Sequence, residues 1–445
     1  MTMTMAGGLG LPALLAAATI GLWAFALLPE FLTALLFFAA ATTLRLVPSE
    51  VIFSGFASSA FWLVLSGFVI GTAIRKVGLA DRVAGLVAPY LAGSWPALVA
   101  GTVGLTYALA FVMPSNMGRI AVLMPVVMAL ADRAGLAAQG AGPEGRDQVG
   151  RGRAGLALAV GFGTFQLSAS ILPANVPNLV MAGAAESAYG IHLSYLPYLA
   201  LHAPVLGLLK GAVLAGCIIL LFAPGPLVPA TAGPAPGPMS AAEKRLAILL
   251  LATLALWMTD AVHGVPAAWI GLASACLCLM PRIGFLTGDE FATGVNVRTC
   301  LYIAGILGFA AVVTRTGLGD RVGEAVLSWL PLDPARPAAS VAGLVGLATL
   351  LNFVVTANGI PALFTPLARL LAEGSGLPLA TVLMVQVIGY ATPLLPYQAS
   401  PIVVAMGMGR VSARDGALLC LTVAAVTAVV LVPLDILWFR ALGRL

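Results

Sequence analysis

The stretch at residues 113–119 constrains the fold more than any other part of the chain. It reads Met-Pro-Ser-Asn-Met-Gly-Arg and interrupts an apolar run that extends over about 94–131. Irregular backbone cannot face lipid, because its N–H and C=O groups find no hydrogen-bond partners in hydrocarbon. It is tolerated only where it is buried in protein or lines a cavity. A related break lies at residues 355–361, so we expect the fold to bring the two breaks together.

Composition places the rest of the chain in a membrane. Of the 445 residues, 60 % are hydrophobic and 9 % are charged, and the mean hydropathy is +1.04. Many apolar runs reach the length of about 20 residues that spans a bilayer as a helix. We therefore predict an all-α polytopic membrane protein. The net charge of +5 does not indicate a nucleic-acid partner, because the basic residues lie in loops between apolar runs.

The chain contains an internal repeat. Residues 74–83 read Ile-Arg-Lys-Val-Gly-Leu-Ala-Asp-Arg-Val, and residues 313–322 read Val-Thr-Arg-Thr-Gly-Leu-Gly-Asp-Arg-Val. Five positions match at one offset of 239 (317 − 78), and Pro125 recurs as Pro366 at a nearby offset. The same order of elements throughout both halves indicates two structural repeats rather than chance.

A proline-rich linker separates the two halves. Six prolines fall between residues 224 and 238, which rules out a helix there. Each repeat is predicted to hold about five transmembrane helices, a re-entrant hairpin and a broken helix. The predicted units are residues 1–223 with a hairpin at about 94–133 and a broken helix at 154–184, a linker at 224–243, and residues 244–445 with a hairpin at about 337–373 and a broken helix at 378–409.

The distribution of Lys and Arg predicts the orientation. Five crossings in each half invert the second repeat relative to the first. One face then carries thirteen of the 22 Lys and Arg residues and the other carries seven. Because the richer face is usually cytoplasmic, we expect a multi-pass protein of the inner membrane with both termini outside.

Two inverted repeats with broken segments are typical of secondary transporters whose binding site lies near the midplane. Carbonyls of unwound backbone and side-chain oxygens can replace the water around Na⁺, and half-helix N-termini attract anions. Ser115, Asn116, Thr356 and Asn358 have suitable side chains at the two breaks. The alternative is that they are helix caps and turn formers, as such residues commonly are. Their matching places in the repeat favour a binding role.

These motifs resemble those of the divalent anion:sodium symporter family of the ion transporter superfamily. In that family each hairpin tip carries Ser-Asn-Thr about nine residues before a proline. Here Ser115 and Asn116 precede Pro125 at that spacing, and residues 356–358 precede Pro366. The family's Thr-Pro-Pro-Asn run is present in weakened form at residues 175–178 (Asn-Val-Pro-Asn) and 395–401.

The resemblance implies sodium-coupled symport of a dicarboxylate, tricarboxylate or sulfate by elevator-type alternating access, in a homodimer. It implies one Na⁺ site at Ser115 and Asn116 with carbonyls near Ser168. A second site follows at Thr356 and Asn358 with carbonyls near Thr392. No other cofactor is expected, and the partners are the anion and the lipid bilayer. The candidate binding residues are Ser115, Asn116, Ser168, Ser170, Asn175, Asn178, Thr356, Asn358, Thr392, Gln398 and Ser400.

Departures from the family pattern leave alternatives open. Met117 and Gly359 stand where the family has threonines, and Ile402 ends the second weakened run. A proton-coupled carrier or a sodium-independent anion exchanger of the same fold therefore remains an alternative. An integral membrane enzyme is a remote one, because the sequence has no Ser-His-Asp spacing, metal-ligand cluster or paired carboxylates in a span.

Arg119 is the most informative single residue, because charge within a span is expensive. Its counterpart in the second repeat is about Ile360. Either Arg119 contacts an anionic substrate or replaces the charge of a cation, or it snorkels to the surface or pairs with a carboxylate. His202 and Lys210 also lie on apolar helices. They belong either to a proton relay or to interfacial anchors.

Overall fold

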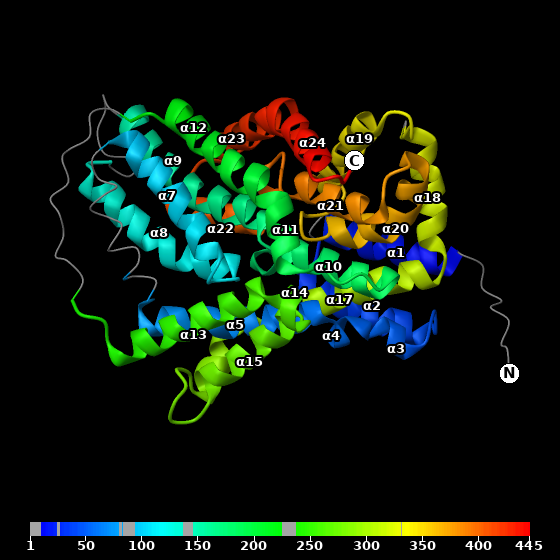
Figure 1. Cartoon of the computed structure of the whole chain (residues 1–445), viewed down its shortest axis with the longest axis horizontal. Coiled ribbons are helices and arrows are strands. Elements are labelled where there is room, and N and C mark those ends of the chain that lie inside the picture. Colours follow the sequence, from blue (N-terminus) through cyan, green and yellow to red (C-terminus); the bar gives the residue numbers. More distant parts are fainter. Residues whose placement is uncertain are drawn as a thin grey trace.

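The structure is a computed structural model that describes residues 10–24, 27–79, 82, 94–136, 146–224, 237–330 and 332–445. All of the regular elements in these ranges are helical (Figure 1). Four continuous helical stretches among them are long and apolar enough to cross a bilayer: Ser59–Val77, Tyr195–Leu221, Val297–Arg315 and Ala413–Ala441. The prediction of an all-α polytopic membrane protein is therefore confirmed.

One layer of helices forms the lower band of Figure 1. Helix α5 packs on α15, and α17 packs on α2 and α4. Phe37, Ile70 and Ile303 are among the buried side chains of the core that these helices share. The lower layer consists of α1 (Gly10–Ala24), α2 (Glu30–Thr43), α3 (Ser49–Ile52), α4 (Ser54–Ala57), α5 (Ser59–Val77), α13 (Ala241–Met258), α14 (Asp260–His263), α15 (Ala267–Leu279), α16 (Gly288–Gly294) and α17 (Val297–Arg315).

The upper layer holds both hairpins and most of both broken helices, around a second core that includes Phe162, Phe364 and Val385 (Figure 1). Helix α9 packs on α7, α8 and α22, and α21 packs on α19 and α20. The upper layer consists of α7 (Trp95–Ala110), α8 (Asn116–Arg133), α9 (Arg146–Gln166), α11 (Tyr195–His202), α12 (Lys210–Leu221), α18 (Leu318–Trp329), α19 (Pro337–Leu350), α20 (Ile360–Ser375), α21 (Leu379–Tyr390), α22 (Ser400–Gly409), α23 (Ala413–Val426) and α24 (Val432–Ala441).

Helix α10 (Val176–Tyr189) connects the layers, because it packs on α5 and α17 below and on α20 above. Each layer draws helices from both halves of the sequence, so the two inverted-topology repeats interleave. Their details also recur. Gly78 and Gly317 both end a helix with positive φ, at +80° and +74°, a conformation that glycine adopts without strain.

The first broken helix differs in detail from the sequence expectation of 154–184. Helix α9 already begins at Arg146, and α10 continues to Tyr189. Two consecutive 3₁₀ turns, Leu167–Ser170 and Leu172–Ala174, form the first break. The linker predicted at 224–243 lies mostly outside the described residues, and α13 begins at Ala241 behind a capping box formed by Ser240 and Glu243.

Candidate substrate and ion site

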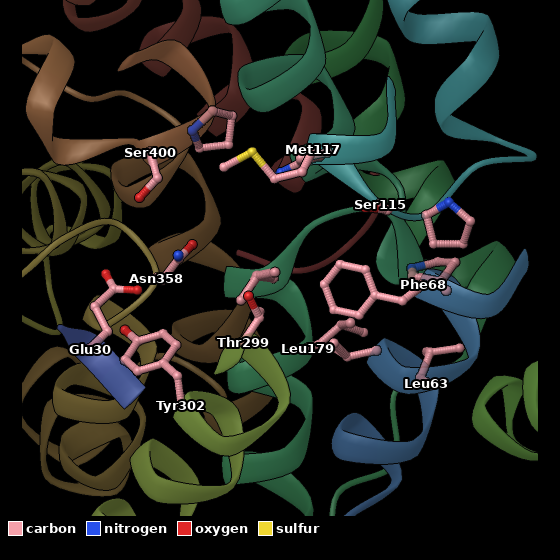
Figure 2. Close-up of a pocket in the computed structure, with 17 residues that line it drawn as sticks. Glu30, Leu63, Phe68, Ser115, Met117, Leu179, Thr299, Tyr302, Asn358 and Ser400 are labelled. Atoms are coloured by element: carbon pink, nitrogen blue, oxygen red, sulfur yellow. The ribbon is translucent and has the colours of Figure 1, made fainter. Parts of the chain in front are cut away.

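A cavity of about 110 Å³ lies where the two hairpin tips and the two broken helices meet (Figure 2). The first hairpin contributes Pro114, Ser115, Asn116 and Met117, and the first broken helix contributes Pro173 and Val176. The second repeat contributes Asn358, Ser400 and Pro401. The expectation that the fold brings the two breaks together is therefore met by the geometry.

Several helices begin at this cavity. Among its lining residues, Glu30, Asn116, Val176 and Ser400 are the first residues of α2, α8, α10 and α22. Thr299 also lines the cavity, and helix α17 begins two residues before it. Helices α10 and α22 have no side-chain cap, so no side chain of the described chain caps the N–H groups at their starts. Converging N-termini carry positive partial charge, which favours an anion.

The lower layer supplies the opposite wall, which the sequence did not point to. Figure 2 shows Glu30, Tyr302 and Thr299 on one side of the cavity, and Leu63 and Phe68 of α5 on the other. An acidic residue after a proline at the start of an apolar helix reads simply as a favourable helix start. Nothing in the sequence indicated that the Glu30 carboxylate faces the cavity.

The first break is held by a network of side chains. The Asn116 Nδ2 donates to Asn175 Oδ1 at 2.9 Å, and the Asn175 Nδ2 donates to the carbonyl of Phe165 at 3.0 Å. Ser168 Oγ donates to the carbonyl of Thr164 at 2.7 Å and lies 3.3 Å from Asn116 Oδ1. The structure thus brings together Asn116, Ser168 and Asn175, three of the candidate binding residues, of which Asn116 and Ser168 belong to the predicted first Na⁺ site.

Arg119 lies inside this network and is 0 % exposed. Its Nη2 donates to the carbonyls of Thr164 and Ala174, each at 3.1 Å. The guanidinium also donates to the carbonyl of Met113 and to Asn116 Oδ1. All four acceptors are neutral oxygens, three of them on backbone at or near the breaks. Arg119 therefore neither snorkels nor pairs with a carboxylate within the described chain, so those two alternatives are wrong.

The remaining first-repeat candidates have structural contacts. Ser115 Oγ accepts a hydrogen bond from the N–H of Gly118 at 3.1 Å, so Ser115 caps α8 as the alternative to a binding role expected. Ser170 is buried and donates to the carbonyl of Leu167 at 2.7 Å. Asn178 donates to the carbonyl of Ile171 at 2.9 Å and accepts from the Tyr390 hydroxyl at 2.8 Å. Asn178 thereby fixes the first break against α21 and does not line the cavity.

The second break is built differently. The N–H of Ala357 donates to the carbonyl of Gln398 at 2.9 Å, and Gln398 Oε1 accepts from the N–H groups of Leu394 and Leu395 at 2.7 and 3.0 Å. Asn358 and Ser400 line the cavity.

Thr392 is held elsewhere, by Lys210. The Lys210 Nζ donates to the Thr392 hydroxyl at 2.8 Å, and no hydrogen bond in the described chain joins Thr392 to Thr356 or Asn358. The second Na⁺ site, at Thr356 and Asn358 with carbonyls near Thr392, stays a prediction.

Comparison with known proteins identifies the family. The family described as "sodium:sulfate symporter transmembrane region" matches residues 11–445. The chain belongs to the sodium:sulfate symporter family. This confirms the resemblance to the divalent anion:sodium symporters that the hairpin-tip and broken-helix motifs indicated.

Relatives of this symporter-family chain include antiporters. The L-tartrate/succinate antiporters of Shigella dysenteriae and Escherichia coli K12 are each 25 % identical over 404 residues, covering 86 % of this chain and 79 % of theirs. A membrane protein of Cupriavidus necator is 25 % identical over 289 residues, 62 % of this chain, and the match spans about half (53 %) of that relative's length.

A solved structure shares the fold. The YdaH transporter of Alcanivorax borkumensis superimposes with a TM-score of 0.53 at 15 % identity, over 88 % of this chain and 86 % of that one. At this identity the likeness concerns the fold alone. The family is one of symporters and the relatives from Shigella dysenteriae and Escherichia coli are antiporters, so the interpretation as an integral membrane enzyme is excluded, and the chain is a multi-pass membrane transporter.

Proposed function

We propose that this transporter exchanges small di- or tricarboxylates across the inner membrane. We also propose that no sodium ion binds at its first break. The observation that carries the anion specificity is the convergence of the N-termini of α2, α8, α10, α17 and α22 on one cavity, with α10 and α22 uncapped. Such N-termini favour carboxylates. Two relatives are L-tartrate/succinate antiporters, which supports the same substrate class.

Arg119 supports exchange rather than sodium symport. Its guanidinium donates to the carbonyls of Thr164 and Ala174 and to Asn116 Oδ1, the kinds of oxygen that a Na⁺ ion at the first break would need. A bound Na⁺ leaves with the substrate, but a tethered guanidinium stays. The empty site therefore keeps a positive charge, and moving that charge through an apolar environment is expensive unless an anion accompanies it. This favours return of the carrier only with a second anion.

Sodium-coupled symport remains a second candidate because of the second break. Asn358 lines the cavity there, and Thr356 is half-buried beside it. The hairpin position that matches Arg119 is Ile360, so the second hairpin supplies no cation of its own. A single Na⁺ held by Thr356, Asn358 and nearby carbonyls would couple the anion to the sodium gradient, whereas Ser115 and Asn116 are proposed to need no sodium.

The two layers give the proposed movement a physical basis. Each has its own hydrophobic core, and the cavity lies between them, lined by hairpin tips on one side and by α2, α5 and α17 on the other. We propose that the upper layer moves past the lower one as an elevator, and that the protein is a homodimer with both termini outside. The homodimer rests on the family resemblance, and the position of the termini rests on the distribution of Lys and Arg.

Proteoliposome counterflow tests this function. Liposomes loaded with unlabelled succinate, tartrate, citrate or sulfate are diluted into labelled succinate, with Na⁺ or with choline as the only cation. We expect internal dicarboxylate to drive uptake equally in both media, with little uptake into empty liposomes. Uptake into empty liposomes that follows an inward Na⁺ gradient would replace exchange with symport.

A further inference from the structure

A second buried cation lies at the second broken helix. Lys210, the first residue of α12, is 0 % exposed, and its Nζ donates to the carbonyl of Ala391 at 2.7 Å and to the Thr392 hydroxyl at 2.8 Å. Ala391 and Thr392 immediately follow α21, whose C-terminal carbonyls carry negative partial charge. The ammonium thus occupies carbonyl and hydroxyl oxygens that the sequence predicted for a second Na⁺ ion.

A buried carboxylate accompanies this lysine. Asp435 of α24 is 0 % exposed, and its charge acts on that of Lys210. The two side chains form no direct ion pair, and neither Asp435 oxygen has a hydrogen-bond partner within the described chain. A carboxylate left without hydrogen bonds inside a membrane protein marks a functional site by default. Binding or releasing one proton there changes the net charge beside Lys210 by one.

Lys210 and Asp435 occupy corresponding parts of the two repeats. Lys210 follows the π-helical segment Ala203–Leu209, and Asp435 comes four residues after the π-helical segment Thr427–Leu431. These two π-helical segments pack against each other. Because π-helical insertions occur frequently at functional sites, their pairing here supports a functional role for the two charges.

A second cavity of about 220 Å³ lies between α11, α21 and α24, on the side of α24 that carries Phe439. Tyr198 and Phe439 line that cavity and contact the buried ring of His202, with ring centroids 4.6 and 6.2 Å apart. Neither His202 nitrogen has a hydrogen-bond partner in the part of the chain that is described. Phe439 lies one helical turn after Asp435 on the same face of α24. The other titratable and charged groups around this cavity are His192, Tyr198, Tyr390 and Arg444.

We propose that Asp435 binds a proton during transport, and that the Lys210–Asp435 pair then supplies the positive charge which a second coupling cation would provide. The proton comes from water in the cavity beside His202 and returns to water when Asp435 ionises. While Asp435 is ionised it offsets the charge of Lys210, and while it is protonated the ammonium acts alone on the C-terminal end of α21.

The charges balance best in the protonated state. A dicarboxylate dianion carries two negative charges, and in the upper layer Arg119 together with an uncompensated Lys210 supplies two positive ones, whereas Glu30 stays with the lower layer. With Asp435 ionised, the loaded site retains a net negative charge that must cross an apolar environment at a cost. This inference rests on the proposed dicarboxylate exchange, and it predicts that acid accelerates that exchange.

Succinate counterflow at equal internal and external pH, from about 5.5 to about 8.5, tests the proposal, because burial can bring a carboxyl group into this range. We expect the wild-type rate to fall about tenfold towards alkaline pH. Asp435→Asn should hold the acid rate across the range, to within about twofold, because it mimics the protonated carboxyl. Lys210→Gln should lose about tenfold or more of the acid rate. Protonation of succinate is the same in assays of the wild type and of each variant. A difference between two pH profiles of the exchange rate is therefore caused by the protein.

His202→Gln is the matched control, since His202 is a second buried titratable group near this cavity but is not the proposed proton acceptor, and it should keep the wild-type profile. Should Asp435→Asn fail to fold, the charge-neutral Lys210→Gln/Asp435→Asn protein should exchange at the alkaline wild-type rate at every pH. An unchanged pH profile in either Asp435 protein, or its loss in His202→Gln, would overturn the proposal. Absence of counterflow in the wild type would overturn the proposed exchange and this inference together.

Discussion

The two breaks occupy matching places in the repeat, yet different charges complete them. At the first, Arg119 comes from the return helix of the hairpin itself and donates to four oxygens around the break. At the second, Ile360 takes the matching hairpin position and is buried, while Lys210 arrives from α12 and binds the end of α21. One cation therefore belongs to a hairpin, and the other to a neighbouring helix.

This difference shows how one architecture can use tethered charges in unequal ways. A guanidinium stays protonated in proteins, and the described acceptors of Arg119 are all neutral, so none of them offsets its charge. Lys210 lies beside Asp435, whose ionisation can offset it. We infer a division of labour, in which the first break is charged at all times and the second is charged only when a proton binds.

Removing the fixed charge should have the largest effect. Arg119→Gln leaves up to four buried acceptors without donors, and each unsatisfied buried group costs about 1–3 kcal/mol. We expect succinate exchange to fall by about 100-fold or more, measured as initial counterflow in choline medium. The matched substitution in the other repeat, Ile360→Met, changes no charge and should keep most of the activity.

The same variant sharpens the comparison when Na⁺ is added. With the guanidinium gone, Asn116 Oδ1 and the carbonyls of Thr164 and Ala174 are left to coordinate a cation. We therefore expect Na⁺ to restore part of the Arg119→Gln activity in a saturable way while leaving the wild type unaffected. A variant that stays inactive at all Na⁺ concentrations although folded would mean that Arg119 only holds the break together.

The two hairpin asparagines should separate stability from binding. Asn116 bonds Asn175 and Arg119, whereas Asn358 is half-buried at the cavity. We expect Asn116→Ala to lower the free energy of unfolding by about 1–3 kcal/mol because it leaves buried groups unpaired. Asn358→Ala should raise the KM for exchange several-fold with little change in thermal stability in detergent. The reverse pattern would show that the substrate is held mainly by the first hairpin.

Sequence reasoning located the two breaks, and with them Asn116, because irregular backbone in an apolar run must be buried or line a cavity. The family resemblance added Ser168 and Asn175. Sequence reasoning did not find the partners of Arg119, since these are mostly backbone carbonyls that leave no trace in residue type. It placed Thr392 with Thr356 and Asn358 by analogy, but the contact of Thr392 with Lys210 depends on how α12 packs against α21. Such helix-to-helix contacts are set by the tertiary fold rather than by local pattern.

Glu30 tests the wall that the sequence did not reveal. It is the one carboxylate among the described residues that line the substrate cavity. A like charge a few ångströms from a bound anion opposes binding by roughly 1 kcal/mol or more at the dielectric of a partly wet site. Glu30→Gln should therefore lower the KM for succinate by about fivefold. Glu30→Asp keeps the charge and should leave the KM near that of the wild type, and an equal KM in all three proteins would place the anion away from this wall.

The smallest effect concerns the duplicated Asp-Arg sequence that follows Gly78 and Gly317. Arg82 forms an ion pair with Glu243 at 2.6 Å with both side chains largely buried, whereas Arg321 meets Glu324 at 3.6 Å in solvent. Hydrogen bonds from Arg82, together with the N–H of Ser240, lower the pKa of Glu243 to about 2. A lowered pKa means that ionised Glu243 stabilises the fold above its unfolded pKa of about 4.3 and that this contribution is lost as pH falls towards 2.

Arg82→Gln should accordingly lower the thermal midpoint at neutral pH, and the difference from wild type should shrink only below about pH 4, where the carboxylate of the variant protonates earlier. Arg321→Gln should shift the midpoint little at any pH, because exposed ion pairs contribute about 0–1 kcal/mol. Both midpoints are measured by thermal unfolding in the same detergent. Equal shifts would mean that the repeated arginines are interchangeable, and that the asymmetry between the halves is confined to the two breaks.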